Sequence, residues 1–83
     1  MTALRVLYFA AVRDLAGVDE EAVTVPDDVT NVAELRAWLE QHREAFSGRL
    51  VATRFARNET FAQDGDAIAT GDVIAIIPPV AGG

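Results

Sequence analysis

The sequence VIAIIPPVAGG at residues 73–83 decides much of the fold and chemistry that we expect of this chain. Its first five residues, 73–77, are all apolar, which predicts a strand buried within a sheet. Pro78 and Pro79 then fix φ and remove two backbone donors. We therefore expect the chain to leave the sheet at this point as an extended arm.

The arm ends in Gly82 and Gly83. Glycine has no Cβ, so the terminal carbonyl is unshielded and the backbone can pass through a channel too narrow for other residues. Such a tail suits a protein whose own C-terminal carboxylate reacts. We predict two parts, a folded domain at residues 1–77 and an extended tail at residues 78–83 that carries the reactive diglycine.

Composition disfavours several classes of protein. The 83 residues, 51% of them apolar, suffice for one small domain. The absence of cysteine excludes disulfides and thiolate metal sites, and it is compatible with the reducing cytoplasm where we expect the chain. A net charge of −6 disfavours nucleic acid and fits either a basic partner surface or a merely solvated one. No apolar run is long enough to span a membrane, so we expect no membrane partner.

Alternating and β-branched segments predict a mixed sheet of four to five strands. Besides residues 73–77, we expect strands at residues 4–10, 21–25 and 60–62, and a further strand within residues 49–57. The segments 4–10 and 73–77 are apolar on both faces, as central strands are.

One substantial helix is predicted after the second strand. Asn31 can cap its N-terminus, and Glu34 three residues later completes a capping-box pattern. We expect this helix to stop at Gly48. A further helical turn is predicted at residues 11–15, ended by Gly17. The apolar stripe of the main helix, flanked by Trp38, consists of Val32, Leu35, Leu39, His42 and Phe46.

These elements indicate an α+β fold in which the sheet packs on one main helix. One helix covers only one face of a sheet. The other face is apolar as well, so it is either exposed to water or covered in part by a partner, and we favour the partner.

The polar side chains offer little chemistry of their own. His42, the only histidine, lies on the predicted helical stripe, and we expect a structural role for it. Three aspartates lack the ligand spacing of an EF-hand, so we predict turns and no metal site at Asp64, Asp66 and Asp72. Three arginines either dock an acidic group or, as we favour, occupy exposed strand positions: Arg49, Arg54 and Arg57.

By elimination, the reactive group is the Gly83 carboxylate. A carboxylate is a poor electrophile and is usually activated as a mixed anhydride with AMP. Activation requires ATP, a metal ion and a phosphate site, and the sequence contains no Gly-rich phosphate loop. We therefore expect a partner enzyme to adenylate the tail. The acyl-adenylate then gives a thiocarboxylate with a sulfide equivalent, or an amide conjugate with an amine.

Two segments, VLYFAAVRDLAG at residues 6–17 and GDVIAIIPPVAGG at residues 71–83, resemble a known family. They are similar to the first strand and short helix, and to the last strand and tail, of the small subunit of molybdopterin synthase. The central helix and the pair Asn58 and Glu59 also stand where that family has them. The resemblance implies a β-grasp (ubiquitin-like) fold and a heterotetramer, with two small subunits at the ends of a large-subunit dimer.

The resemblance also implies roles for the tail. Gly83 would carry sulfur as a thiocarboxylate and donate it, inside the active site of the large subunit, to a cyclic pterin precursor of molybdopterin. Gly82 would allow passage through the channel. The contacts of the inserted tail would be made by Pro79, Val80 and Ala81.

The same resemblance implies the partners. A separate enzyme would adenylate the tail with ATP and Mg²⁺, and a sulfurtransferase would supply the sulfur. The chain would bind no cofactor and would be the sulfur-donating subunit of a sulfurtransferase, with no catalytic side chain of its own. The apolar sheet face would meet the large subunit, and its candidate residues are Leu7, Phe9, Ile74 and Ile76.

One position departs from the family, and three other functions stay open. Arg57 stands where the strand before Asn58 usually ends in small apolar residues, which would alter strand pairing or partner choice. A sulfur carrier for thiamin thiazole or tRNA thiolation uses a similar tail, although thiazole carriers tend to lack the helical insert at residues 11–17. A ubiquitin-like modifier uses the same adenylation, although a chain without lysine cannot link to itself through lysine. A plain binding module would keep its function without Gly82 and Gly83.

Overall fold

The computed structural model describes residues 1–79, which form a five-stranded sheet, two α-helices and one 3-10 helix. In chain order the elements are β1 (Thr2–Tyr8), α1 (Ala10–Ala16), β2 (Glu20–Val25), α2 (Val32–His42), η1 (Glu44–Phe46), β3 (Arg54–Arg57), β4 (Thr60–Ala62) and β5 (Val73–Ile77).

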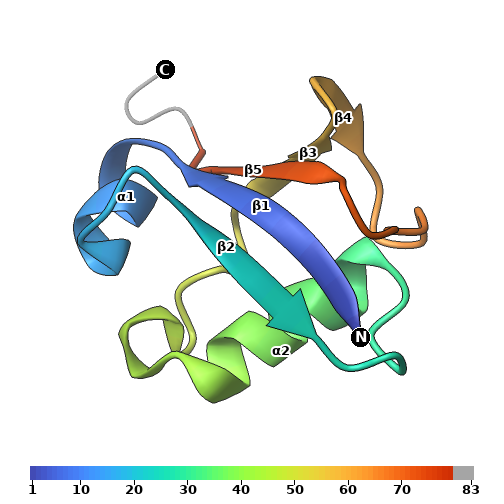
Figure 1. The fold of residues 1–83 in the computed structure, drawn as a ribbon. Coiled ribbons are helices and arrows are strands. Elements are labelled where there is room, and N and C mark those ends of the chain that lie inside the picture. The colour runs from blue at the N-terminus through green and yellow to red at the C-terminus, as the bar shows by residue number, and fades with distance from the viewer. Residues whose placement is uncertain (80–83) are drawn as a thin grey trace.

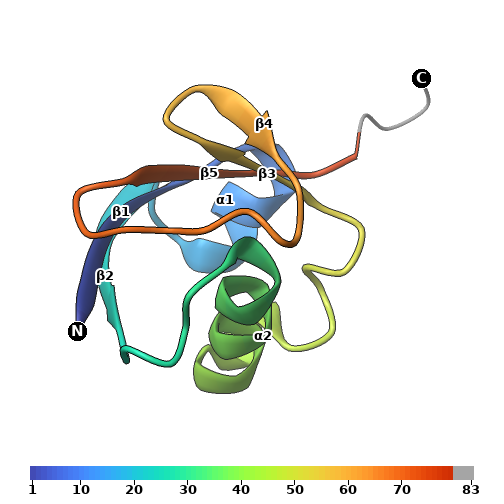
Figure 2. The ribbon, with the colours of Figure 1, turned by 90° about the vertical axis from the view of Figure 1, so that its right-hand side faces the viewer.

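The sheet is mixed, and its strand order is β2-β1-β5-β3-β4. β1 and β5, the first and last strands, run parallel at the centre, with Val6 opposite Ile74 and Leu7 opposite Ala75. β2 and β3 flank them in antiparallel pairing. α2 lies across one face of the sheet in both views (Figure 1 and Figure 2). This is the β-grasp arrangement, and it confirms the predicted fold class.

The hydrophobic core fills the space between the sheet and α2. Side chains alternate along each strand, so every second residue of β1, β2 and β5 enters this space. Phe46 of η1 packs against Tyr8, with ring centroids 5.5 Å apart. The fully buried side chains of the core include Val6, Val12, Val25, Val32, Leu35, Leu39, Phe46, Leu50, Phe55, Ile74 and Ile76.

The start of α2 follows from local hydrogen bonding. The side chain of Asn31 accepts a hydrogen bond from the backbone N–H of Glu34 at 2.8 Å, as predicted. The Glu34 carboxylate reaches one residue further back than a capping box does, and accepts from the backbone N–H of Thr30 at 2.7 Å and from its hydroxyl at 2.8 Å. These bonds hold the pKa of Glu34 below its usual value.

The end of α2 differs from the prediction, because the helix stops at His42 and not at Gly48. Arg43 adopts an extended conformation, and its guanidinium bonds Glu21 of β2 at 2.6 Å. The chain then turns through η1, which returns Phe46 to the core. His42 is therefore exposed instead of lying on the buried stripe, and its ring stacks on Trp38 with centroids 4.4 Å apart.

The third strand lies within residues 49–57, as predicted, and β3 occupies only Arg54–Arg57 of that range. The preceding residues form a turn in which Leu50 is buried and Val51 is 79% exposed. The hydroxyl of Thr53 donates to the carbonyl of Leu50 at 2.6 Å, and Glu40 of α2 accepts from the N–H of Leu50 at 2.8 Å. These bonds occupy the carbonyl and the N–H of Leu50, which in a strand would pair with a neighbouring strand.

The remaining elements agree closely with expectation. β1, β2, β4 and β5 lie within two residues of their predicted bounds, and α1 ends at Gly17, whose φ is 79°. Asp64 and Asp66 lie in turns, where Asp64 pairs with Arg36 at 2.8 Å.

Within residues 1–79, no three His, Cys, Asp or Glu side chains gather in a group that could hold a metal ion. None of the helices in that range is both long enough and apolar enough to cross a membrane.

Candidate functional site

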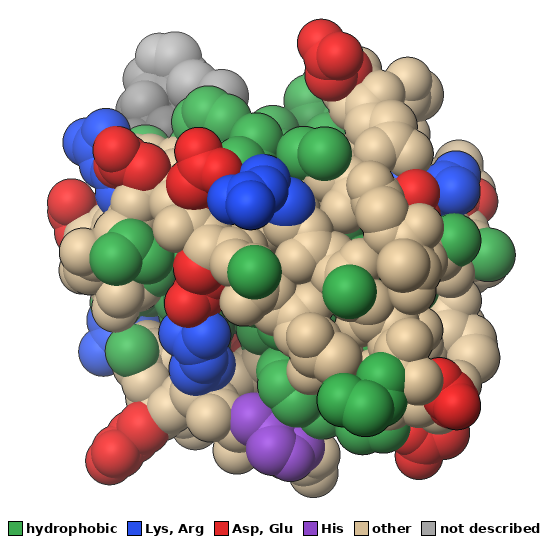
Figure 3. All heavy atoms as spheres, in the orientation of Figure 1, with side chains coloured by type: hydrophobic (Ala, Val, Ile, Leu, Met, Phe, Trp, Pro, Cys, Tyr) green, Lys and Arg blue, Asp and Glu red, His purple; other side chains and the backbone are tan. Residues whose placement is uncertain are grey.

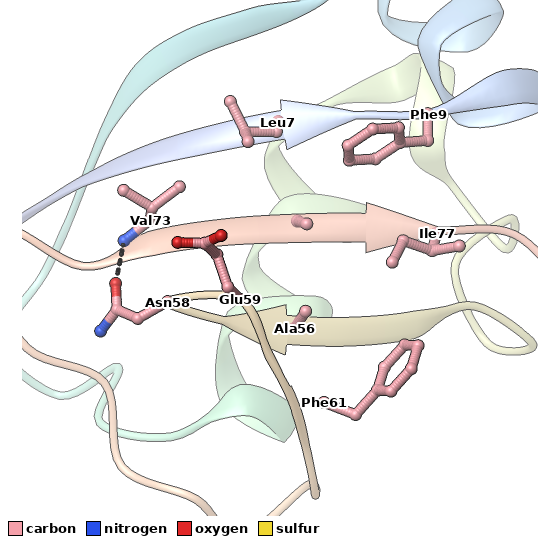
Figure 4. Close-up of a pocket in the computed structure, with 9 residues that line it drawn as sticks. Leu7, Phe9, Ala56, Asn58, Glu59, Phe61, Val73 and Ile77 are labelled. Atoms are coloured by element: carbon pink, nitrogen blue, oxygen red, sulfur yellow. Dashed lines mark hydrogen bonds between the residues drawn. The ribbon is translucent and has the colours of Figure 1, made fainter.

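The sheet face that α2 leaves uncovered contains an apolar groove of about 590 Å³, which we call the sheet groove. Its floor and walls come from β1, β5, β3 and the β3–β4 hairpin (Figure 4). In Figure 3, hydrophobic side chains gather along the upper edge of the molecule, on the side of the sheet away from α2. The residues that line the groove are Leu7, Phe9, Ala56, Asn58, Glu59, Phe61, Val73, Ala75 and Ile77.

The hollow shape follows from strand register and side-chain size. Ala75 of β5 lies opposite Leu7 on one side and Ala56 on the other, so small side chains occupy the middle of the face. Phe9 and Phe61 stand beside this floor, and these residues are 45% and 58% exposed. Exposed aromatic residues beside a shallow apolar floor are typical of a surface that binds another protein.

Only part of the predicted partner surface is in the sheet groove. Leu7 and Phe9 line it, as expected. The prediction for Ile74 and Ile76 was wrong, because both side chains are fully buried against the core on the opposite face of β5. The sequence interpretation missed Val73, Ala75 and Ile77 of the same strand, together with Ala56 and Phe61.

The C-terminal arm begins at one end of the sheet groove. Ile77 lines the groove and is the last residue of β5, so the chain leaves the sheet at Pro78 and Pro79 as predicted. The tail residues predicted to react or to contact a partner, apart from Pro79, lie outside the described residues: Val80, Ala81, Gly82 and Gly83.

A second hollow, of about 420 Å³, lies beneath the base of the arm. Pro78 and Pro79 form one wall, and α1 together with the segment from Ser47 to Thr53 forms the rest. Arg49 contributes a cation there. Residues 77–79 therefore border two concave surfaces, of which the sheet groove is the larger and is the one lined by aromatic residues.

Comparison with known proteins identifies the family. The sequence profile described as "ThiS family" matches residues 6–83, which is nearly the whole chain. The chain belongs to the ThiS family. The molybdopterin synthase sulfur carrier subunit of Chlamydomonas reinhardtii is a relative with 35% identity over 82 residues, covering 96% of this chain and 98% of that protein. The predicted resemblance is thereby confirmed.

Solved structures of similar fold include molybdopterin converting factor subunits and small archaeal modifier proteins. A putative molybdopterin converting factor subunit 1 from Pyrococcus furiosus superposes with a TM-score of 0.82 at 29% identity, covering 96% of this chain and all of that one. Small archaeal modifier protein 1 of Haloferax volcanii gives 0.81 at 26% identity, with the same coverage. A complex of subunits 1 and 2 of the molybdopterin-converting factor from Helicobacter pylori gives 0.69 at 25% identity, covering 99% of this chain and all of that one.

In this ThiS-family chain, Asp72 joins the β3–β4 hairpin at one end of the sheet groove to the segment that precedes β5. This buried carboxylate accepts from Arg57 Nε at 2.6 Å, from Asn58 Nδ2 at 3.1 Å and from the backbone N–H of Ala69 at 2.8 Å. Burial acts to raise the pKa of Asp72, but these hydrogen bonds outweigh it and hold the pKa below its usual value. The carboxylate therefore remains ionised at neutral pH and fixes the start of β5.

Arg57, the position that departs from the family pattern, belongs to this same network. Its residue pairs in register with Thr60 and Ile74, so the strand continues through it. Its guanidinium bonds Asp72, and Arg57 is not among the residues that line the sheet groove. β3 is therefore paired on both sides through Arg57, and an effect of Arg57 on partner choice stays a prediction.

Proposed function

We propose that this protein is the sulfur carrier of molybdenum cofactor biosynthesis, acting as the small subunit of molybdopterin synthase. The observation that carries the proposal is the sheet groove, which leads to the base of the C-terminal arm in a chain of the ThiS family. Relatives that match over nearly their whole length are named sulfur carrier subunits of that synthase. A carrier of this kind needs a docking surface and a reactive end, and this chain offers both.

The reactive end is the carboxylate of Gly83. In the first step its oxygen attacks the α-phosphorus of ATP, which releases pyrophosphate and leaves an acyl-adenylate. A sulfide equivalent then attacks the acyl carbon and displaces AMP, so that a thiocarboxylate replaces the carboxylate. ATP and Mg²⁺ belong to the activating enzyme, and a sulfurtransferase supplies the sulfur. The thiocarboxylate then gives its sulfur to a cyclic pterin precursor, and water restores the carboxylate.

The docking surface is the sheet groove, and its occupant is the large subunit of the synthase. Phe9 and Phe61 are the two aromatic anchors that such a partner would bury. The likeness to the Helicobacter pylori complex of subunits 1 and 2 supports a partner of this kind. We propose a heterotetramer in which each tail, from Pro79 through Val80, Ala81 and Gly82, enters the active site of a large subunit in the cytoplasm.

A protein modifier is the second candidate function. The likeness to small archaeal modifier protein 1 favours it, because a modifier activates its C-terminus by the same adenylation. The two functions differ in the nucleophile that attacks the acyl-adenylate, which is a sulfur donor for the carrier and a lysine amine for the modifier. A carrier for thiamin thiazole or tRNA thiolation would differ only in its acceptor.

The deciding experiment is an intact-mass measurement after co-production with the activating enzyme and a sulfur source. The carrier function predicts a mass shift equal to one oxygen replaced by one sulfur, absent from the chain that lacks Gly82 and Gly83. Addition of the large subunit and the cyclic pterin precursor should then reverse the shift and yield molybdopterin. Adducts of higher mass that survive reductant would favour the modifier, and an unchanged mass beside a converted control carrier would reject both.

A further inference from the structure

Glu59 is the only charged residue among the nine that line the sheet groove. Its carboxylate extends from the β3–β4 turn over β5, on the same side as Leu7 and Val73 (Figure 4). The neighbouring arginines have other partners: Arg57 bonds Asp72, and Arg54 lies over the ring of Phe61 at 4.2 Å from its centroid. Among the ion pairs within residues 1–79, none involves Glu59. The groove therefore presents an unpaired anion at one end of an apolar floor.

The backbone at Glu59 is strained by its position. Asn58 and Glu59 both have positive φ, at 51° and 71°, as the two central residues of a tight hairpin turn do. Asparagine tolerates this conformation, and the preferred second residue is glycine. Glutamate has no such tolerance, so local backbone energetics disfavour it here. Strain of this kind at an unpaired charge beside a groove is typical of a side chain retained for function.

The turn that carries Glu59 is rigidly attached to β5. The N–H of Asn58 donates to the carbonyl of Val73 at 2.8 Å, and the side-chain carbonyl of Asn58 accepts from the N–H of Val73 at 2.9 Å. The amide group of Asn58 also donates to Asp72. Because three bonds fix the residue before it, the backbone that carries Glu59 is held in place before any partner arrives, which lowers the part of the entropic cost of pairing that comes from the backbone.

We propose that Glu59 is the charged specificity residue of the sheet groove, and that it pairs with an arginine or lysine of the protein that covers the groove. The proposal rests on the proposed function, under which that protein is the large subunit of the synthase. A basic partner also complements the net charge of −6. Docking on the apolar floor removes water from around the carboxylate, which strengthens its attraction to a cation and penalises a partner that lacks one.

The position of the charge also gives the groove a direction. Glu59 stands near Val73, at the beginning of β5, whereas Arg54 pairs in register with Ile77, at the end of β5 next to the arm. Glu59 is therefore an anion within one end of the groove, and Arg54, which is not among the lining residues, is a cation beside the other end. A partner with its cation opposite Glu59 docks in one orientation, with its active site towards Pro78.

The test measures binding of the purified large subunit to four forms of the full chain by titration calorimetry. Glu59→Gln keeps the shape of the side chain and removes its charge, and we expect it to weaken binding roughly three- to tenfold at about 0.05 M salt. Glu59→Lys should weaken it further, and both differences should shrink at about 0.5 M salt. Glu44→Gln is the matched control, because Glu44 is exposed on η1, far from the groove lining, and should bind as the wild type does.

The outcomes separate this proposal from the function on which it rests. Binding of Glu59→Gln and Glu59→Lys equal to that of the wild type would overturn the role of Glu59 and leave the sulfur carrier function standing. Weaker binding that does not depend on salt would also overturn it, because it would show a loss of packing instead of a loss of charge. Absence of binding by the wild-type chain itself would reject the large subunit as partner, and this proposal with it.

Discussion

Asn58 and Val73 exchange two hydrogen bonds, one from the backbone N–H of Asn58 to the carbonyl of Val73 and one from the N–H of Val73 to the side chain of Asn58. In the second bond, the side chain of Asn58 accepts from a strand N–H that elsewhere in a sheet would pair with the backbone of a neighbouring strand. It joins the β3–β4 hairpin turn to the first residue of β5 and so closes one end of the sheet groove.

Replacement of Asn58 by alanine should destabilise the domain. Asn58→Ala removes the two side-chain bonds, to the N–H of Val73 and to Asp72, keeps the backbone bond to the carbonyl of Val73, and places alanine at a φ of 51°. We therefore expect a loss of about 1–3 kcal/mol in the free energy of unfolding. Urea denaturation followed by circular dichroism measures it. Asn58→Gly is the control, since it loses the same bonds without backbone strain and should cost less. Equal losses for the two variants would contradict the contribution of φ.

Asp72 should make stability depend on acid pH. Its pKa is lowered in the folded chain, so its contribution is complete above the pKa of the unfolded chain, about 3.9, and is lost as the pH falls through the lower folded value. Asp72→Asn should be less stable than the wild type at about pH 6, and the difference between the two should narrow towards about pH 2. Urea midpoints across this range measure the difference. Subtracting the stability of the variant from that of the wild type at each pH removes the contribution of Glu21, because the Arg43 bond lowers the pKa of Glu21 in both chains.

The elements that could be predicted are those set by neighbours in the sequence. The start of α2 depends on Asn31, Thr30 and Glu34, which bond within four residues of one another. The stop of α1 at Gly17 depends on one left-handed residue. Such signals need no knowledge of the rest of the fold, and they gave nearly correct bounds.

The features that were predicted wrongly depend on contacts distant in the sequence. Residues 73–77 are all apolar, so no polar residue marks which side chains of the strand face α2, and the inward face of Ile74 and Ile76 is decided by pairing with β1 and β3. The end of α2 at His42 is followed by the bond from Arg43 to Glu21 of β2, a residue distant in the sequence. The sequence signal that could have located the groove was the small size of Ala56 and Ala75. Their side chains leave space on the sheet face that α2 does not cover.

A charge placed in the middle of the sheet groove should block the partner without unfolding the domain. Ala75 lies on the groove floor and is only half-buried, so Ala75→Glu leaves the core untouched and should weaken binding of the large subunit by more than roughly tenfold. The measurement is calorimetry together with a thermal melt. Ala37→Glu, on the exposed surface of α2, makes the same change on the other side of the sheet and should bind normally. Normal binding by Ala75→Glu would show that the groove is not the docking surface.

A methyl group near the end of the tail should slow the chemistry and leave the fold unchanged. Gly82→Ala adds a Cβ where the proposed function requires passage through a narrow channel, and we expect thiocarboxylate formation or sulfur transfer to slow by about tenfold or more. Single-turnover assays with intact-mass detection measure each step separately. Urea denaturation is the control and should match the wild type. Rates equal to those of the wild type would remove the reason that we give for glycine at this position.

Replacement of Glu59 by glycine should stabilise the protein and weaken its binding to the partner. Glycine adopts the φ of 71° without steric cost, and this gain exceeds the entropy that glycine adds to the unfolded chain, for a net increase of about 0.5–1 kcal/mol in the free energy of unfolding. Glu44→Gly changes the same residue type outside the positive φ region and should destabilise η1. Because Glu59→Gly also removes the carboxylate from the sheet groove, its affinity for the large subunit should fall as that of Glu59→Gln does. A more stable chain that binds less well shows that glutamate at this turn is kept for recognition. A variant that is not stabilised would show that the turn carries no strain. The role of Glu59 would then rest only on its unpaired charge in the sheet groove.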